Sequence, residues 1–158
     1  MSHATEREPG DAHEDLPEQT PVVLVVEAVH SPGVSYEALL ERAGYSVIVS
    51  SGEQAMSVSQ KMQPALIILQ LDPAVSGLGL VRQLRTQPDT RATPVITIVP
   101  FDDGHMREQI VRTGATAIMI EPVKLPMLLR QMRRLLARMG GASHPMPAAP
   151  KVPAASVR

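Results

Sequence analysis

Residues 65–70 read Ala-Leu-Ile-Ile-Leu-Gln, and this stretch decides the fold of the chain. Its apolar residues follow one another without alternation, which is typical of a strand buried on both faces within a parallel sheet. The stretch ends in the polar Gln70. Because ligands of open parallel sheets bind beyond the carboxyl ends of the strands, Gln70 marks the edge of the sheet where a functional site is expected.

Segments of the same kind recur on both sides of this strand. Four more strands are predicted from short β-branched segments at 22–26, 45–50, 94–99 and 116–120. Amphipathic segments fill the intervals and predict helices at 35–43, 53–62, 78–86, 104–113 and 125–139. Five β/α units joined by right-handed crossovers predict a single α/β domain with a doubly wound parallel sheet.

The two ends of the chain differ from this pattern and from each other. Residues 1–20 lack apolar periodicity and carry six acids against the single Arg7, while residues 140–158 are rich in proline and alanine. We expect an acidic disordered tail at 1–20, a folded domain at 21–139 and a flexible basic tail at 140–158. The net charge of −1 therefore conceals opposite charges at the two ends, which either solubilise the chain or make electrostatic contacts.

The composition excludes several classes of protein. The chain has no cysteine, so it has no disulfide, thiolate metal site or cysteine nucleophile. No apolar run reaches the roughly 18 residues of a membrane span, and the acidic start lacks the pattern of a secretory signal. We therefore expect a cytoplasmic protein without membrane insertion. The sequence contains no P-loop, Gly-x-Ser-x-Gly motif or nucleophile–base pair, so no enzymatic activity is expected.

Several local patterns occur in a common order and spacing across residues 22–139. They are Val-Val-Leu-Val-Val-Glu at 22–27, Ser-Gly-Glu-Gln-Ala at 51–55, Ser-Gly-Leu-Gly-Leu-Val-Arg at 76–82, Gly-Ala at 114–115 and Glu-Pro-Val at 121–123. Together with 65–70, they resemble the response-regulator receiver domain of bacterial two-component signalling. The resemblance implies a flavodoxin-like (βα)5 fold that is switched by phosphorylation of an aspartate.

Phosphorylation in the family that this chain resembles needs four kinds of group: a carboxylate nucleophile, an acidic pair that holds a divalent cation, a hydroxyl residue and a lysine. This chain departs from the pattern at nearly every position. The nucleophile aligns with Gln70, the acidic pair with Glu27 and Ala28, the hydroxyl residue with Val99, the switch aromatic with Ile118 and the lysine with Glu121. Because an amide does not attack phosphorus, the resemblance implies a degenerate pseudo-receiver that lacks the phospho-accepting aspartate.

The acids near this edge leave two alternatives open. Asp72 lies two residues past Gln70 and is a candidate substitute phospho-acceptor, although an ordinary loop acid or helix cap is the simpler interpretation. Glu27, Glu121 and Asp72 could also converge and hold Mg²⁺ or Ca²⁺ through oxygen ligands. The simpler interpretation is again that the carboxylates point outward. No other cofactor is expected.

A stripe of arginines marks the predicted helix at 125–139. Arg130, Arg134 and Arg138 recur four residues apart with Arg133 beside them, and leucine and methionine at helical spacing form the opposite, core-facing side. The stripe is either a solvated face, a protein-docking face or a contact with nucleic acid or membrane. No helix-turn-helix, zinc finger or stacking aromatic accompanies it, so nucleic-acid binding is not expected.

Three functions remain. The favoured one is a phosphorylation-independent pseudo-receiver that serves as a protein-interaction or scaffold module in two-component-type signalling. It would act through the face formed by the fourth helix, fifth strand and fifth helix, on a protein partner or in a homodimer. The second is a receiver that senses a small molecule or cation in the vestigial acidic pocket. The third is a regulator phosphorylated unconventionally at Asp72.

Overall fold

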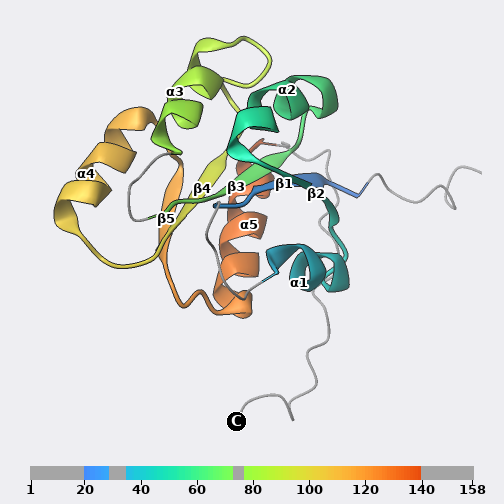
Figure 1. Ribbon diagram of the computed structural model, residues 1–158. Helices are drawn as coiled ribbons and strands as arrows, with labels where there is room; N and C mark the ends of the chain where they lie inside the picture. The colour runs from blue at the N-terminus through green and yellow to red at the C-terminus, as the bar shows by residue number, and fades with distance from the viewer. Residues whose placement is uncertain (1–19, 29–34, 73–76, 140–158) are drawn as a thin grey trace, which may run out of the picture.

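The computed structural model describes residues 20–28, 35–72 and 77–139 of the chain. A five-stranded parallel sheet runs through the centre, with helices on both of its faces (Figure 1). The strands are β1 (Val22–Val26), β2 (Ser46–Ser50), β3 (Leu66–Gln70), β4 (Val95–Val99) and β5 (Ala117–Ile120). The helices are α1 (Tyr36–Arg42), α2 (Gly52–Met62), α3 (Leu78–Thr86), α4 (Gly104–Thr113) and α5 (Leu125–Met139). The predicted fold is therefore confirmed.

The strand order β2-β1-β3-β4-β5 determines where the functional edge lies. The order reverses between β1 and β3, and Val26 of β1 pairs with Leu69 of β3 next to their carboxyl ends. In doubly wound sheets this reversal opens a crevice that binds ligands. Gln70, the last residue of β3, lies at this point and pairs in register with Ile98 of β4.

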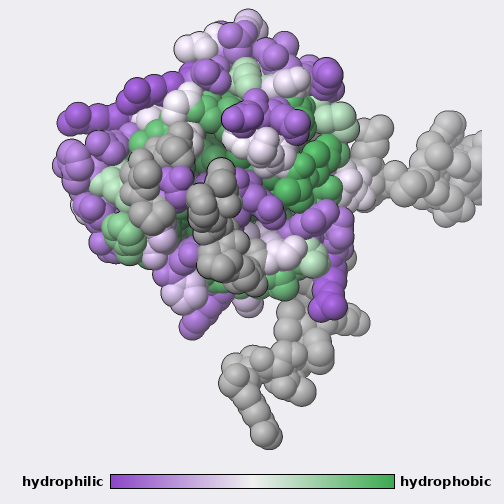
Figure 2. Space-filling view, viewed as in Figure 1, coloured by the Kyte–Doolittle hydropathy of each residue, from purple (hydrophilic) through white to green (hydrophobic). Residues whose placement is uncertain are grey.

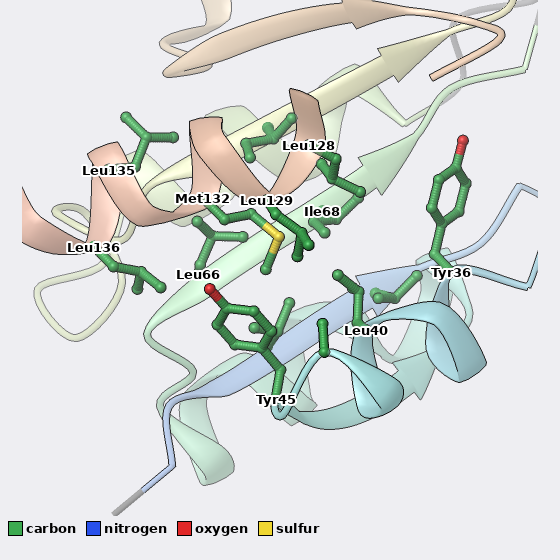
Figure 3. Close-up of a cluster of buried hydrophobic side chains, with 14 of the residues drawn as sticks. Tyr36, Leu40, Tyr45, Leu66, Ile68, Leu128, Leu129, Met132, Leu135 and Leu136 are labelled. Carbon is green, nitrogen blue, oxygen red and sulfur yellow. The ribbon is translucent and has the colours of Figure 1, made fainter. Parts of the chain in front are cut away.

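Two apolar cores lie on opposite faces of the sheet. Successive residues of β3 pack alternately into the two cores. Ile68 packs with α1 and α5, whereas Ile67 packs with α2, α3 and α4. Both side chains are fully buried, which explains why the strand is apolar without alternation. Figure 3 shows the first core, where Leu129, Met132 and Leu136 of α5 point toward β3 and α1. The predicted apolar side of α5 is buried as expected.

Several predicted boundaries shift by one residue because capping residues lie outside the helices. Ser35 accepts a hydrogen bond from the Ala38 amide and Ser51 accepts one from the Gln54 amide, so these two serines are N-caps of α1 and α2. Helix α2 consequently begins at Gly52. Four strands likewise begin one residue later than predicted, because their first expected residue lies outside the continuous strand ladder.

Arg85 of α3 ties together two loops, the one before β4 and the one before β5, at the amino-terminal edge of the sheet. Its Nε donates to the Gly114 carbonyl at 2.9 Å, and one terminal nitrogen donates to the carbonyls of Arg91 at 3.1 Å and Thr93 at 2.7 Å. The other terminal nitrogen donates to the Thr116 hydroxyl at 3.3 Å. Partial burial lowers the pKa of Arg85. No carboxylate among the described residues forms an ion pair with it. The guanidinium therefore acts as a hydrogen-bonding anchor rather than as an ion-pair partner.

The outer surface is mixed in character. On the face seen in Figure 2, hydrophilic residues cover most of the helices and hydrophobic residues reach the surface mainly between them. Phe101, Val111, Met62 and Met127 are exposed large apolar residues. Among the described helices, none has the length and apolarity that crossing a bilayer requires.

Candidate functional site

Gln70 occupies the centre of the carboxyl edge. It closes β3 and is only 5 % exposed, and the next amide, that of Leu71, donates to the Ile98 carbonyl at 2.9 Å. The backbone therefore holds this side chain between β1 and β4, at the switch point of the sheet. A buried neutral amide here adds no negative charge with which to bind a cation, and it has no nucleophilic oxygen for phosphoryl transfer.

Glu27 and Ala28 directly follow β1, the strand next to β3 in the sheet. The Glu27 amide donates to the Ser50 carbonyl at 3.2 Å, which extends the β1–β2 pairing by one bond. The Glu27 side chain is exposed and Ala28 is half-buried. One carboxylate is therefore present on this side of Gln70, in solvent.

Glu121 places a negative charge at the end of β5. Its amide donates to the Val99 carbonyl at 2.8 Å and its side chain is exposed, while the peptide to Pro122 is cis. The pKa of the Tyr36 phenol at the start of α1 is raised, first by burial and then by the carboxylate of Glu121. The negative charge of Glu121 thus acts at the start of α1, and an incoming anion would meet repulsion at this position rather than the attraction of a lysine.

Aliphatic side chains close the space between β4, α4 and β5. Val99 is 3 % exposed and Ile118 is half-buried, and both pack in the core of α2, α3 and α4. The crevice that they line with Phe101 and Met106 has no room for a water molecule. The nearest hydroxyl on the strand, that of Thr97, already donates to the Ala117 carbonyl at 3.1 Å. No hydroxyl of β4 is therefore available to sense a phosphoryl group.

The structure does not bring the three acids together. Within residues 20–28, 35–72 and 77–139, no group of three or more His, Asp or Glu side chains could hold a metal ion. Glu27 and Glu121 are exposed, while Asp72 is half-buried beyond the end of β3. The alternative of a cation site formed by Glu27, Glu121 and Asp72 therefore finds no support among the described residues, and the exposure of Glu27 and Glu121 agrees with the simpler interpretation that these carboxylates point outward. The loop after Asp72, residues 73–76, lies outside the described residues.

The arginines of α5 divide into two sets. Arg130, Arg134 and Arg138 are exposed, whereas Arg133 is half-buried on the side of α5 that faces Tyr45. Burial raises the pKa of the Tyr45 phenol, and the nearby guanidinium of Arg133 offsets part of that rise. Among the described residues, the α5 arginines form no ion pair. Their positive charge is therefore uncompensated on this surface.

Comparison with known proteins places this geometry in a family. The family model described as the response regulator receiver domain matches residues 23–133. The chain belongs to this family. The matched region includes β2 to β5 and α1 to α4 completely, β1 except for Val22, and α5 as far as Arg133.

Two curated relatives and one solved structure illustrate the range of similar receivers. The phosphate regulon transcriptional regulatory protein PhoB of Rhizobium meliloti is 31% identical over 120 residues, which are 75% of this chain and 53% of that protein. This chain thus spans about half of its length. The polar-differentiation response regulator DivK of Brucella ovis is 28% identical over 119 residues, which are 74% of this chain and 97% of DivK. The receiver domain of a signal transduction histidine kinase from Syntrophus aciditrophicus has a TM-score of 0.67 and 29% identity, covering 82% of this chain and 99% of that one.

Two interactions between distant residues of this receiver were not predicted from the sequence. The influence of Glu121 on Tyr36 links residues 85 positions apart, and the approach of Arg133 to Tyr45 links α5 with the turn before β2. The chain has only two tyrosines among its largely aliphatic core residues. That scarcity is the only signal in the sequence that could have singled them out.

Proposed function

We propose that this receiver is a phosphorylation-independent docking module in two-component-type signalling. The observation that carries the proposal is the buried amide of Gln70 at the switch point of the sheet, in place of a carboxylate. Membership of the receiver family supports a role in signalling. The absence of a nucleophile at Gln70 supports a role that does not depend on phosphoryl transfer.

The surroundings of Gln70 support the same conclusion. Transfer of a phosphoryl group requires positive charge to offset the charge of the phosphoryl oxygens. Here the neighbouring charged side chains at the ends of β1 and β5 are Glu27 and Glu121. Acids at this edge therefore oppose the binding of a phosphodonor.

The first test is chemical. When the chain is incubated with acetyl phosphate and Mg²⁺, we expect no gain of a phosphoryl group in the intact mass, because neither Gln70 nor its neighbours supply a nucleophile with a bound cation. Beryllofluoride with Mg²⁺ should leave the melting temperature unchanged for the same reason. A hydroxylamine-labile phosphate located at Asp72 by peptide sequencing would instead establish the unconventional regulator.

The docking surface that we propose is the exposed side of α5 with the adjoining α4 and β5. Three exposed arginines there, Arg130, Arg134 and Arg138, make it a match for a partner with acidic side chains. Met127 is 57% exposed and Val111 is 63% exposed, so α5 and α4 each offer an apolar contact as well. A second copy of the chain is one partner that this face could accept.

The second test is a matched pair of charge reversals. Affinity capture with the variant Arg130→Glu/Arg134→Glu/Arg138→Glu should lose the partners that the unaltered chain retains. The control is Arg82→Glu/Arg91→Glu, which reverses exposed arginines of α3 and the loop after it. The association rate constant for a partner on the α5 face should fall as salt is added. Equal capture by the unaltered chain and by both variants would exclude α5 as the docking face.

A further inference from the structure

Four positive charges on α5 lack a compensating charge among the residues that the structure describes. The helix contains four arginines and no acid, and no acid occurs anywhere after Glu121. Arg130 and Arg134, like Arg134 and Arg138, are four residues apart, and like charges at that spacing destabilise a helix. Within the described residues none of these guanidinium groups pairs with a carboxylate. The surface therefore favours any anionic segment that can reach it.

The chain carries such a segment on its amino-terminal side. Residues 6–18 contain six acids, Glu6, Glu8, Asp11, Glu14, Asp15 and Glu18, against Arg7 alone. The first described residue after these acids is Thr20, which lies two residues before the start of β1. The tether between the acids and the folded domain is consequently only a few residues long.

The fold brings the start of β1 to the side of α5. Val22 pairs with Ser46 at the start of β2, and the preceding residue, Tyr45, packs in one core with Leu136 of α5. Thr20 and Tyr45 line the same open depression at this edge. Figure 3 shows the ring of Tyr45 between α1 and α5. Because Arg133 is the charged group that approaches the Tyr45 hydroxyl, the point where the acidic segment joins the domain lies next to the basic helix.

The lengths are compatible with a direct contact. An extended chain advances about 3.3–3.6 Å per residue, so Glu18 lies within about 7 Å of Thr20 and Asp15 within about 18 Å. Arginines four positions apart on a helix are separated by about 6 Å along its axis. The opposing charge at this edge is Glu41 of α1, which lines the depression.

We infer that the acidic segment 6–18 docks on the arginine face of α5 within the same molecule. A short tether gives the segment an effective concentration in the millimolar range, so weak ion pairs suffice to keep the face occupied at low salt. The contact screens the repulsion between the arginines. An external acidic partner must displace the acidic segment from α5 before it can bind there. Only this consequence rests on the proposed docking function.

The test exploits the absence of native cysteine, since Ala12→Cys provides a single site for a nitroxide spin label. In the labelled, ¹⁵N-enriched chain at 50 mM salt, we expect line broadening of the α5 amides at Arg130–Arg138, with little at Arg82 on α3. The Debye length falls from about 14 Å at 50 mM to about 4 Å at 500 mM salt, so the broadening should decrease at least roughly twofold. Uniform broadening of all surfaces, or none at α5, would overturn the inference.

Two controls distinguish the intended contact from a loss of folding and from a contact between two chains. The variant Arg130→Glu/Arg134→Glu/Arg138→Glu should lose the broadening, and lysine at all six acidic positions of the segment should restore it in that variant, which shows that the altered helix is still folded. A mixture of labelled ¹⁴N chain and unlabelled ¹⁵N chain should show no broadening. Broadening in that mixture would assign the contact to a second copy and overturn the intramolecular assignment.

Discussion

Replacing Arg85 by alanine is expected to lower the free energy of unfolding by about 2–3 kcal/mol. The side chain donates to three carbonyls and one hydroxyl, and the carbonyls of Thr93 and Gly114 are bonded at 2.7 and 2.9 Å. Each such hydrogen bond contributes about 0.5–1.5 kcal/mol in partly exposed surroundings. The arginine stem also packs against Gly114, where a Cβ would come within 3.2 Å of it. Removal therefore loosens the turns before β4 and β5 together.

Urea unfolding followed by circular dichroism measures this change, since the chain has no tryptophan to report it by fluorescence. Arg85→Lys should recover only part of the loss, because an ammonium cannot reach acceptors arranged around a planar guanidinium. Arg82→Ala, at an exposed position of the same helix, is the matched control and should change stability by less than about 0.5 kcal/mol. If Arg85→Ala and Arg82→Ala were equally stable, Arg85 would not be an anchor.

The fold was predictable from the sequence because its signals are local. The uninterrupted apolar residues of 65–70 indicate a strand covered on both faces, and the structure buries Ile67 and Ile68 in opposite cores. Arg85 shows the limit of such reasoning. Its acceptors lie 6, 8, 29 and 31 residues away, and three of them are backbone carbonyls that any residue would offer. No residue pattern records a contact of that kind.

The candidate site was predictable in its positions but not in its geometry. The carboxyl end of a strand can be read from the chain, and Gln70 ends β3 as expected. The directions of Glu27, Asp72 and Glu121 could not be predicted, because they depend on how each loop leaves the sheet. Sequence periodicity reports only on the structure within one segment. Whether acids from different strands converge depends on the path of the backbone in the loops between the segments. The alternative of an acidic cluster could therefore be neither adopted nor rejected from the sequence, although each residue lies at or just past a strand end as predicted.

Restoring the missing side chains is expected to restore binding of a phosphoryl analogue. The variant Ala28→Asp/Gln70→Asp/Val99→Thr/Glu121→Lys should gain a melting-temperature rise of about 5–10 °C with Mg²⁺ and beryllofluoride. Two aspartates beside Glu27 would supply oxygen ligands for the cation, and the reversal at Glu121 would replace repulsion by attraction. The unaltered chain, with the amide of Gln70 at the switch point, should show no rise.

The single variant Gln70→Asp is the decisive comparison. It supplies the nucleophile yet leaves Glu121 opposite the incoming charge and Val99 without a hydroxyl, so its response should remain within about 1 °C of the unaltered chain. A full response of Gln70→Asp alone would mean that Glu121 and Val99 present no obstacle and that one substitution abolished the switch. A silent quadruple variant with unchanged circular dichroism would mean that the loops at the carboxyl edge, and not only these four side chains, have lost the geometry that phosphoryl transfer requires.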